Sequence, residues 1–216
     1  MNIAIIDYKM GNLFSVQHAC KKVGINPLIT SDEKEILGSD GVILPGVGAF
    51  TKAMQHLNEL NLIKPIKNFI KSGKPFLGIC LGMQLLFDES EEFGNSPGLG
   101  IIEGKVLKFP SDVLGNKIKV PQIGWNKIYK NKFPSTGSAD ILKGFDDGEY
   151  MYFVHSYYSK PAHDSDILTT TNYEDINYCS AITRDNIIAT QFHPEKSSKK
   201  GILFYKNWAK LVKERS

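Results

Sequence analysis

Short apolar runs alternate with amphipathic stretches through the first half of the chain. Four of these runs are continuous enough for buried parallel strands: Asn2–Asp7, Pro27–Thr30, Gly41–Leu44 and Pro75–Ile79. Apolar residues recur at helical spacing in the stretches between and after them: Asn12–Val23, Phe50–Leu62, Ile63–Lys71 and Leu81–Phe87. Strands that alternate with helices predict a parallel, doubly wound sheet.

The second half of the chain changes character. Strand-like runs joined by short polar turns follow one another: Ile102–Phe109, Lys117–Tyr129, Tyr150–Ser159, Ile167–Thr171, Cys179–Arg184 and Ile187–Phe192. Asn131–Asp147 is loop-like, and Ser198–Lys213 has the spacing of a closing amphipathic helix. We therefore expect a three-layer α/β fold: a mostly parallel central sheet with antiparallel additions in the second half, flanked by helices. One domain over residues 1–216 accounts for the length.

Composition narrows the class of protein. Hydrophobic residues make up 42% and charged residues 23%, as in folded globular proteins. The net charge of +3 is too small to predict a nucleic-acid-binding surface. Three cysteines, an odd number with no closely spaced pair, argue against a disulfide framework and favour a reducing cytoplasm. The first residues predict a strand rather than a signal peptide, and no apolar run approaches membrane-spanning length.

The strongest local motif surrounds Cys80. Gly78 and Gly82 flank it, a strand precedes it and an apolar helix follows it. This is the arrangement of a nucleophile elbow, with cysteine in the place of serine. A thiol at the start of a helix faces free backbone N–H groups and the positive end of the helix dipole, which favour the thiolate. The alternative is a small buried cysteine at the end of a strand.

A second motif lies near the end of the chain, where His193 and Glu195 follow a predicted strand. Residues two apart in an extended segment point to the same side, so the carboxylate could orient the imidazole. A base with its orienting group is what a cysteine nucleophile requires. A structural histidine is one alternative. Zinc ligation by Cys80, His193 and Glu195 is another, but the fourth ligand is missing, and we expect no metal.

Glycines also follow the strand Gly41–Leu44, in the sequence Pro45-Gly46-Val47-Gly48. Such a loop can turn its backbone N–H groups toward a ligand at the carboxyl end of a parallel strand. Beside a cysteine nucleophile it would stabilise the oxyanion formed on attack of a carboxamide. Without Cys80 the same residues would be interpreted as an ordinary turn.

Together these motifs resemble the class I glutamine amidotransferases. Further stretches resemble the glutaminase subunits of imidazole glycerol phosphate synthases, from Asn2 to about Trp208: Asp7-Tyr8 with Gly11-Asn12-Leu13, Pro45–Phe50, Leu77–Phe87, Ser90–Glu92, Gly124-Trp125-Asn126, Tyr152–Tyr158 and Gln191–Ser197. The resemblance implies a single glutamine amidotransferase type-1 domain. It also implies no cofactor, and a cytoplasmic enzyme of histidine biosynthesis.

The resemblance implies a role for each site residue. Cys80 would attack the side-chain amide of L-glutamine, His193 would move the proton and Glu195 would orient His193. The oxyanion would be held by the N–H groups of Val47, on the Gly46–Gly48 loop, and of Leu81. The residues implied in binding glutamine are Gly82, Gln84, Glu92, His155, Ser156 and Tyr157.

The resemblance also implies a partner. In the family this subunit forms a heterodimer with a (β/α)8-barrel cyclase, to which the ammonia is channelled, and the complex acts as a lyase. The residues at family interface positions are Asn12, Gln122, Trp125 and Lys196. Each has a simpler interpretation as a turn, core or solvent-facing residue. The chain departs from the family at Gln122, where a histidine is common.

Two alternatives follow from these observations. Gln122 favours a paralogue that supplies ammonia for an amidino sugar in surface-polysaccharide biosynthesis. A second alternative, from another class, is a catalytically silent module that regulates a barrel partner, which the intact Cys80, His193 and Glu195 argue against. We also expect the isolated chain to hydrolyse glutamine slowly, because the partner would have to reorganise the oxyanion loop.

Overall fold

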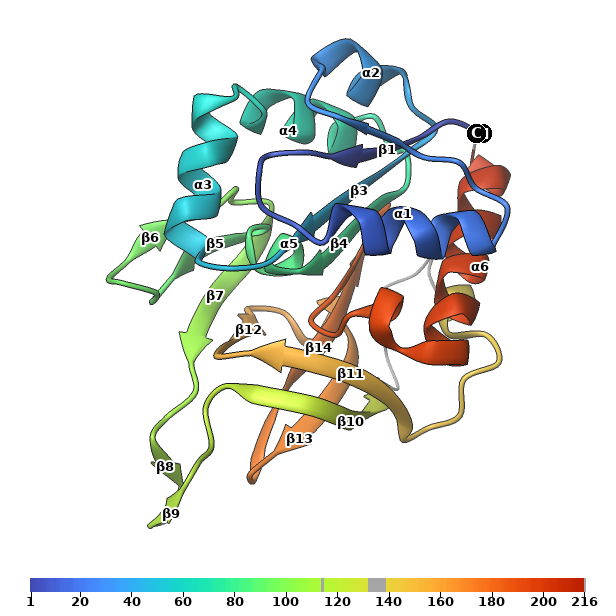
Figure 1. Ribbon diagram of the computed structural model, residues 1–216. Helices are drawn as coiled ribbons and strands as arrows, with labels where there is room; N and C mark the ends of the chain where they lie inside the picture. Colours follow the sequence, from blue (N-terminus) through green and yellow to red (C-terminus); the bar gives the residue numbers. More distant parts are fainter. Residues whose placement is uncertain (114, 132–138, 216) are drawn as a thin grey trace.

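The computed structural model describes residues 1–113, 115–131 and 139–215. Among them, thirteen strands form one sheet, with ten in the order β2-β1-β3-β4-β15-β14-β12-β7-β5-β6. Figure 1 shows the helices packed around one part of this sheet, while the other part extends away from them. The chain therefore has two structural halves that share a sheet.

The parallel half contains the first strands of the chain together with the last. Its strands are β1 (Ile3–Ile6), β2 (Leu28–Thr30), β3 (Gly41–Gly46), β4 (Phe76–Cys80) and β15 (Ile187–Thr190). Every pairing among them is parallel. Burial on both faces of the sheet explains the continuous apolar sequence of β1, β3, β4 and β15, whereas β2, at the edge of the sheet, leaves Leu28 exposed.

Helices cover both faces of the parallel half. They are α1 (Leu13–Lys22), α2 (Glu33–Gly38), α3 (Phe50–Glu59), α4 (Ile63–Lys71), α5 (Leu81–Gln84) and α6 (Ser198–Arg215). Side chains of α1 and α6 pack in one core cluster, and those of α2 to α5 in the other. Alternate residues of β1 divide between the clusters, since Ile3 and Ile5 join the first and Ala4 and Ile6 the second.

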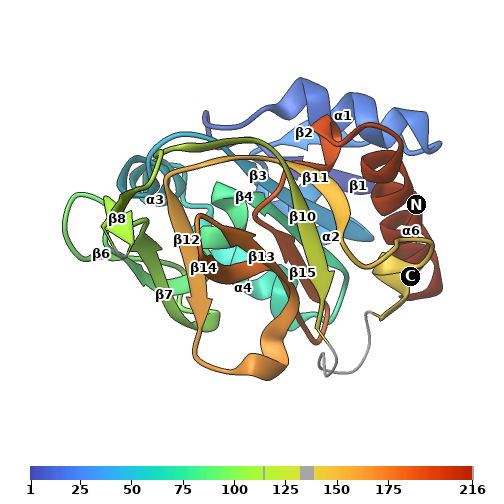
Figure 2. The ribbon, with the colours of Figure 1, turned by 90° about the horizontal axis from the view of Figure 1, so that it is seen from below.

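The second half is mainly antiparallel. Its strands are β5 (Phe87–Ser90), β6 (Ser96–Pro97), β7 (Ile102–Lys108), β10 (Gln122–Lys130), β11 (Glu149–His155), β12 (Tyr157–Pro161), β13 (Ile167–Tyr173) and β14 (Ile176–Arg184). A separate hairpin of β8 (Asp112–Val113) and β9 (Asn116–Lys117) projects from the body. Figure 2 shows β10 and β11 running side by side across the underside of the molecule.

The expected fold class is confirmed, and several elements differ in detail. The predicted helix Leu81–Phe87 ends at Gln84, and the chain continues into β5. The predicted strand Tyr150–Ser159 is two strands that break at Ser156. Helix α2 was not predicted. Within the predicted loop Asn131–Asp147, residues 132–138 lie outside the described part, and Ala139–Leu142 form a 3-10 helix.

The topology brings distant segments to one edge of the sheet. Strand β4 lies between β3 and β15, with Gly46 opposite Cys80 and Thr190 opposite Ile79. The carboxyl ends of these parallel strands therefore meet, and each continues into a segment that carries a candidate motif. Ligands of open parallel sheets bind at this edge.

Candidate active site

A cavity of about 420 Å³ lies at this edge of the sheet. Both candidate chemical groups, Cys80 and His193, face it although they are far apart in sequence. Its lining consists of Val47, Gly48, Cys80, Leu81, Gln84, Glu92, Pro121, Val154, His155, Ser156, Tyr157, His193 and Lys196. The structure thus brings most of the residues singled out in the sequence to one place.

Cys80 occupies a strained backbone conformation at the junction of β4 and α5, with φ 54° and ψ −108°. The flanking glycines are required by close contacts. A Cβ on Gly82 would lie 1.8 Å from the carbonyl oxygen of Leu44, and a Cβ on Gly78 would lie 2.9 Å from the Ala189 Cβ. The elbow therefore turns inside a packed layer where a larger residue has no room.

His193 and Glu195 form a buried pair. The distance from His193 Nδ1 to Glu195 Oε1 is 2.7 Å, and both side chains are 1% exposed. The segment is fastened to β11, since the His193 N–H donates to the Tyr152 carbonyl oxygen. Ser197 strengthens this attachment, because its hydroxyl donates to the His193 carbonyl oxygen at 2.7 Å and accepts from the Tyr152 N–H at 3.0 Å. The imidazole is thereby fixed by its carboxylate and by the backbone.

The electrostatic environment favours a charged imidazole at position 193. Burial opposes the charge, but a negative charge at Cys80, together with the hydrogen-bonded Glu195 carboxylate, raises the pKa of His193 to about 10. The structure therefore favours an imidazolium at position 193, hydrogen-bonded to the Glu195 carboxylate.

The loop that follows β3 borders the same cavity. Val47 is 39% exposed, and Gly48 has a φ of 96°, a conformation that glycine adopts without strain. The loop leads into α3, where the backbone N–H of Phe50 donates to the Glu92 carboxylate. Glu92 thus lies at the positive end of α3 as well as in the lining of the cavity.

Sequence reasoning assigned no role to Gln191, yet it lies at the centre of the buried hydrogen bonds. Its Nε2 is 3.6 Å from the Cys80 sulfur, and its Oε1 accepts from Gln84 Nε2 at 2.9 Å. The same Gln84 amide donates to the Tyr157 carbonyl oxygen at 2.9 Å. Gln191 therefore connects the sulfur with the expected glutamine-binding segment. In the sequence, its position two residues before His193 was the one feature that could have indicated a role for Gln191.

The segment His155-Ser156-Tyr157 lies at the break between β11 and β12. Both ring nitrogens of His155 are engaged within the protein: Nδ1 donates to the Tyr157 carbonyl oxygen at 2.8 Å, and Nε2 is 3.2 Å from the Tyr178 hydroxyl. Burial lowers the pKa of His155 to about 4, against the opposing bond to Tyr157. The neutral ring therefore fixes the shape of the segment, leaving the neighbouring groups to face the cavity.

The expected interface residues fall on two sides of β10. Trp125 is 51% exposed on the outer face, with Ile123 beside it. Gln122 is 2% exposed and accepts a hydrogen bond from the Tyr178 hydroxyl at 2.9 Å. The expectation that Gln122 contacts a partner is therefore corrected: side chains alternate along a strand, and position 122 points inward. Asn12 is half-buried before α1, and Lys196 is exposed at the rim of the cavity.

Within residues 1–113, 115–131 and 139–215, no cluster of three or more histidine, cysteine or acidic side chains could hold a metal ion. In the same described ranges, no helix has the length and apolarity needed to cross a membrane.

Comparison with known proteins decides the family. Residues 4–209 match the family described as glutamine amidotransferase class-I. The chain belongs to the class I glutamine amidotransferases. A solved structure titled as a glutamine amidotransferase superimposes on this amidotransferase with a TM-score of 0.71, covering 98% of both chains at 15% sequence identity. At that identity the likeness supports the fold alone.

Curated relatives are much closer in sequence. The chain is 48% identical to the imidazole glycerol phosphate synthase subunit HisH of Geobacter metallireducens, over 96% of this chain and 97% of the relative. It is 46% identical to the HisH subunit of Aquifex aeolicus, over 99% of both chains. These similarities confirm the family expected from the sequence, and with it an enzyme of the glutaminase class. They do not favour the paralogue of surface-polysaccharide synthesis.

Proposed function

We propose that this glutamine amidotransferase is the glutaminase subunit of an imidazole glycerol phosphate synthase, and that Cys80, His193 and Glu195 carry its chemistry. The observation that carries this proposal is the meeting of Cys80 and His193 in one cavity, with the Glu195 carboxylate 2.7 Å from the imidazole. A buried cysteine, base and orienting carboxylate in this order are the parts of a nucleophilic acyl-transfer site.

The reaction proceeds through a thioester. The Cys80 thiolate attacks the side-chain amide carbon of L-glutamine, and the carbonyl oxygen becomes an oxyanion. His193 donates its proton to the leaving nitrogen, the C–N bond breaks, and ammonia departs. Water, deprotonated by His193, then attacks the thioester and releases L-glutamate and the thiolate. Glu195 keeps the imidazole oriented and stabilises its charged form in both halves of the cycle.

The oxyanion would be stabilised by backbone N–H groups that border the cavity. Val47 and Leu81 belong to two different elements, the loop after β3 and the start of α5, and both line the cavity. Because Gly46 lies opposite Cys80 in the sheet, this loop is held next to the nucleophile. Donors fixed in advance at such a position stabilise developing charge with little reorganisation.

Glutamine would lie along the remaining wall of the cavity. Gln84, Ser156 and Tyr157 line the cavity together with Cys80, and Glu92, which also lines it, supplies a negative charge for the α-amino group. Gly82 does not line the cavity; it acts behind the nucleophile, where the absence of a side chain lets the elbow pack against Leu44. His155 contributes by holding the segment in shape.

A surface for the partner adjoins the cavity. The outward residues of β10 and β11 form an apolar patch, in which the exposed side chains of Ile123 and Trp125 pair across the two strands with the half-buried Val154 and Tyr152. Trp125 packs edge-on against Tyr152, and Lys196 lies over the Tyr152 ring. Val154 and Lys196 also line the cavity. We assign this patch, with Asn12, to a (β/α)8-barrel cyclase that receives the ammonia in a heterodimer.

The cellular setting is part of the proposal. All three cysteines are free and buried. Burial raises the pKa of Cys20 to about 12, and it raises the pKa of Cys179 as well, so both thiols stay protonated and unreactive. Free thiols of this kind fit the cytoplasm, where we place the enzyme as a single domain.

Substitution of the nucleophile tests the proposal. We expect Cys80→Ala to abolish glutamine-dependent formation of imidazole glycerol phosphate by the chain mixed with its cyclase, while ammonia-dependent synthesis by the mixture persists. Cys179→Ala is the matched control, because Cys179 is equally buried but lies on β14, and it should retain glutamine-dependent turnover. Glutamine hydrolysis that survives in Cys80→Ala would refute the proposal.

A further inference from the structure

Tyr8 is a fully buried side chain whose hydroxyl faces the loop after β3. It follows β1, and its ring packs in the core cluster on the α2 to α5 side. A Cβ built on Gly46 would come within 2.4 Å of the Tyr8 hydroxyl oxygen and within 2.8 Å of the Leu81 Cβ. The hydroxyl therefore lies where β3, the oxyanion loop and the elbow meet.

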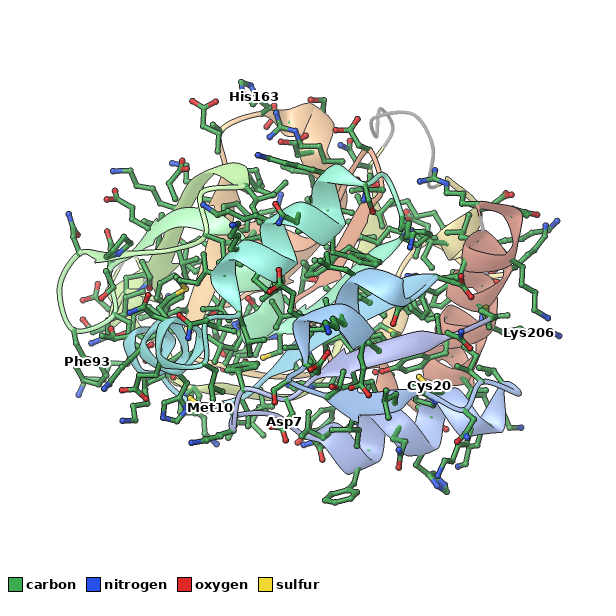
Figure 3. All side chains as sticks on the ribbon, turned by 90° about the horizontal axis from the view of Figure 1, so that it is seen from above. Asp7, Met10, Cys20, Phe93, His163 and Lys206 are labelled. Atoms are coloured by element: carbon green, nitrogen blue, oxygen red, sulfur yellow. The ribbon has the colours of Figure 1, made fainter. Side chains whose placement is uncertain are left out.

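This hydroxyl has no hydrogen-bond partner among the described residues. Desolvation, with a smaller contribution from the charge of Cys80, raises the pKa of Tyr8, so the group remains a protonated donor. The backbone around it is anchored, since His56 Nδ1 donates to the Tyr8 carbonyl oxygen at 3.1 Å, and Asp7 N–H donates to Thr30. Figure 3 shows Asp7 and Met10, which bracket Tyr8, at one edge of the molecule. A fixed, buried and unpaired donor requires a physical explanation.

The geometry of the neighbouring peptide supplies one. The Gly46 carbonyl and the Val47 N–H belong to one trans peptide and point in opposite directions. When the Val47 N–H points into the cavity, the Gly46 carbonyl points away from it, into the protein. There it requires a donor, because an unpaired buried carbonyl is costly. Tyr8 supplies the unpaired donor next to Gly46, and glycine at position 46 permits the peptide to rotate.

We propose that Tyr8 is a positioning residue for the oxyanion loop: its hydroxyl donates to the Gly46 carbonyl when the Val47 N–H turns toward the substrate. This inference rests on the proposed role of Val47 in the glutaminase reaction. The hydroxyl is unpaired in the resting enzyme and paired in the working one, so its removal has opposite effects on stability and on catalysis.

The test is Tyr8→Phe, which removes only the hydroxyl. Because an unpaired buried hydroxyl destabilises the resting chain, we expect the Tm of the isolated chain to rise by roughly 2–4 °C. With the other synthase subunit in excess, we expect kcat for glutamine hydrolysis to fall about tenfold, with KM within about twofold of wild type, because only the oxyanion is affected. Alkylation of Cys80 by iodoacetamide, which develops no oxyanion, should keep its rate.

Ser159→Ala is the matched control. The Ser159 hydroxyl is also buried without a described partner, but it lies on β12, which pairs with β7 and β14. It should reproduce any gain in Tm and leave kcat unchanged. A Tyr8→Phe chain with a lower Tm, an unchanged kcat, or a loss of kcat matched by Ser159→Ala would overturn the role of Tyr8. A wild-type chain that cannot hydrolyse glutamine would instead overturn the proposed function, which separates the two failures.

Discussion

The Glu195 carboxylate acts on His193 through a single hydrogen bond, and its charge helps to keep the imidazole protonated. Glu195→Gln preserves the shape of the side chain and removes its charge. We expect kcat for glutamine hydrolysis to fall by roughly 10²–10⁴-fold, because the imidazolium loses its stabilising partner. Steady-state kinetics with the partner subunit measure this change. Glu214→Gln, an exposed site on α6, serves as the control. A loss no greater than that of the control would contradict the role of Glu195.

His155 makes the stability of the fold depend on pH. Burial lowers its pKa from 6.5 to about 4, so between these values the unfolded chain binds more protons than the folded chain. The contribution of His155 to the free energy of unfolding is therefore fully present above pH 6.5. It is lost as the pH falls toward 4, which lowers the free energy of unfolding by roughly 3 kcal/mol. Urea unfolding from pH 4 to 7 should show this slope, and His155→Gln should flatten it. An equal slope in the variant would assign the effect to other groups.

His193 acts in the opposite direction. Its pKa is raised in the folded chain, so its stabilising contribution is complete below pH 6.5 and is lost as pH rises through about 10. The two histidines together place the most stable range near neutrality.

Single residues differed in how far they could be predicted from the sequence. Cys80, His193 and Glu195 were recognisable because their chemistry requires a short local motif. Gln191 and Tyr8 were not, since their positions depend on contacts with residues far away in sequence, Cys80 and Gly46. Gln122 was placed at the surface by resemblance, although the alternation along β10 turns it inward.

At the scale of elements, the elbow is held by a close approach between α5 and β3. The carbonyl oxygen of Leu44 occupies the place where a side chain at position 82 would begin. We expect Gly82→Ala to destabilise the chain by at least about 2 kcal/mol and to displace Cys80, because backbone atoms cannot move aside cheaply. Chemical denaturation and Cys80 labelling measure the two effects. Gly38→Ala, where a Cβ meets nothing within 4 Å, should be near neutral. Comparable stabilities for the two variants would contradict this account.

The wrongly predicted extent of the helix Leu81–Phe87 has a physical cause. Leu81–Phe87 is apolar throughout, and periodicity alone cannot separate a buried helix from a buried strand. The chain therefore passes from α5 to β5 at a point where the sequence has no helix-ending residue such as glycine or proline. Helix α2 is short, yet the sequence did contain a signal for its start, because aspartate is a preferred residue at a helix N-cap. In the structure the Asp32 side chain accepts hydrogen bonds from the N–H groups of Lys34 and Glu35.

At the scale of the whole molecule, the sheet joins a parallel half that carries Cys80, the proposed nucleophile, to an antiparallel half that carries the proposed glutamine-binding segment His155-Ser156-Tyr157. The alternation of strands and helices predicted the first half well. The order of strands in the second half was beyond prediction, because antiparallel pairings such as β12 with β7 depend on contacts distant in sequence. That residues 1–216 act as one domain stays a prediction.

The patch on β10 and β11 predicts where the partner binds. We expect Trp125→Ala to weaken binding of the cyclase at least about tenfold, because a large exposed aromatic side chain beside the cavity is a typical binding hot spot. Leu28→Ala, which shortens an equally exposed side chain on the distant strand β2, should leave binding unchanged. Calorimetric titration compares the two. Equal affinities would place the interface elsewhere.

The isolated chain should hydrolyse glutamine slowly, and addition of the partner should accelerate it. In the proposed mechanism the Val47 N–H turns into the cavity, and the patch proposed to bind the partner shares Val154 and Lys196 with the lining of that cavity. Glutaminase assays with and without the cyclase measure the ratio of the two rates. Full turnover by the chain alone would contradict this expectation.

Cooperation between Cys80 and His193 across their shared cavity underlies every step of the proposed reaction. The most direct measurement is the rate at which a glutamine-analogue electrophile labels Cys80 at neutral pH, in wild type and in His193→Gln. Because the imidazolium stabilises the reactive thiolate, the account predicts labelling at least about tenfold slower in the variant. Equal labelling rates in two folded chains would contradict it.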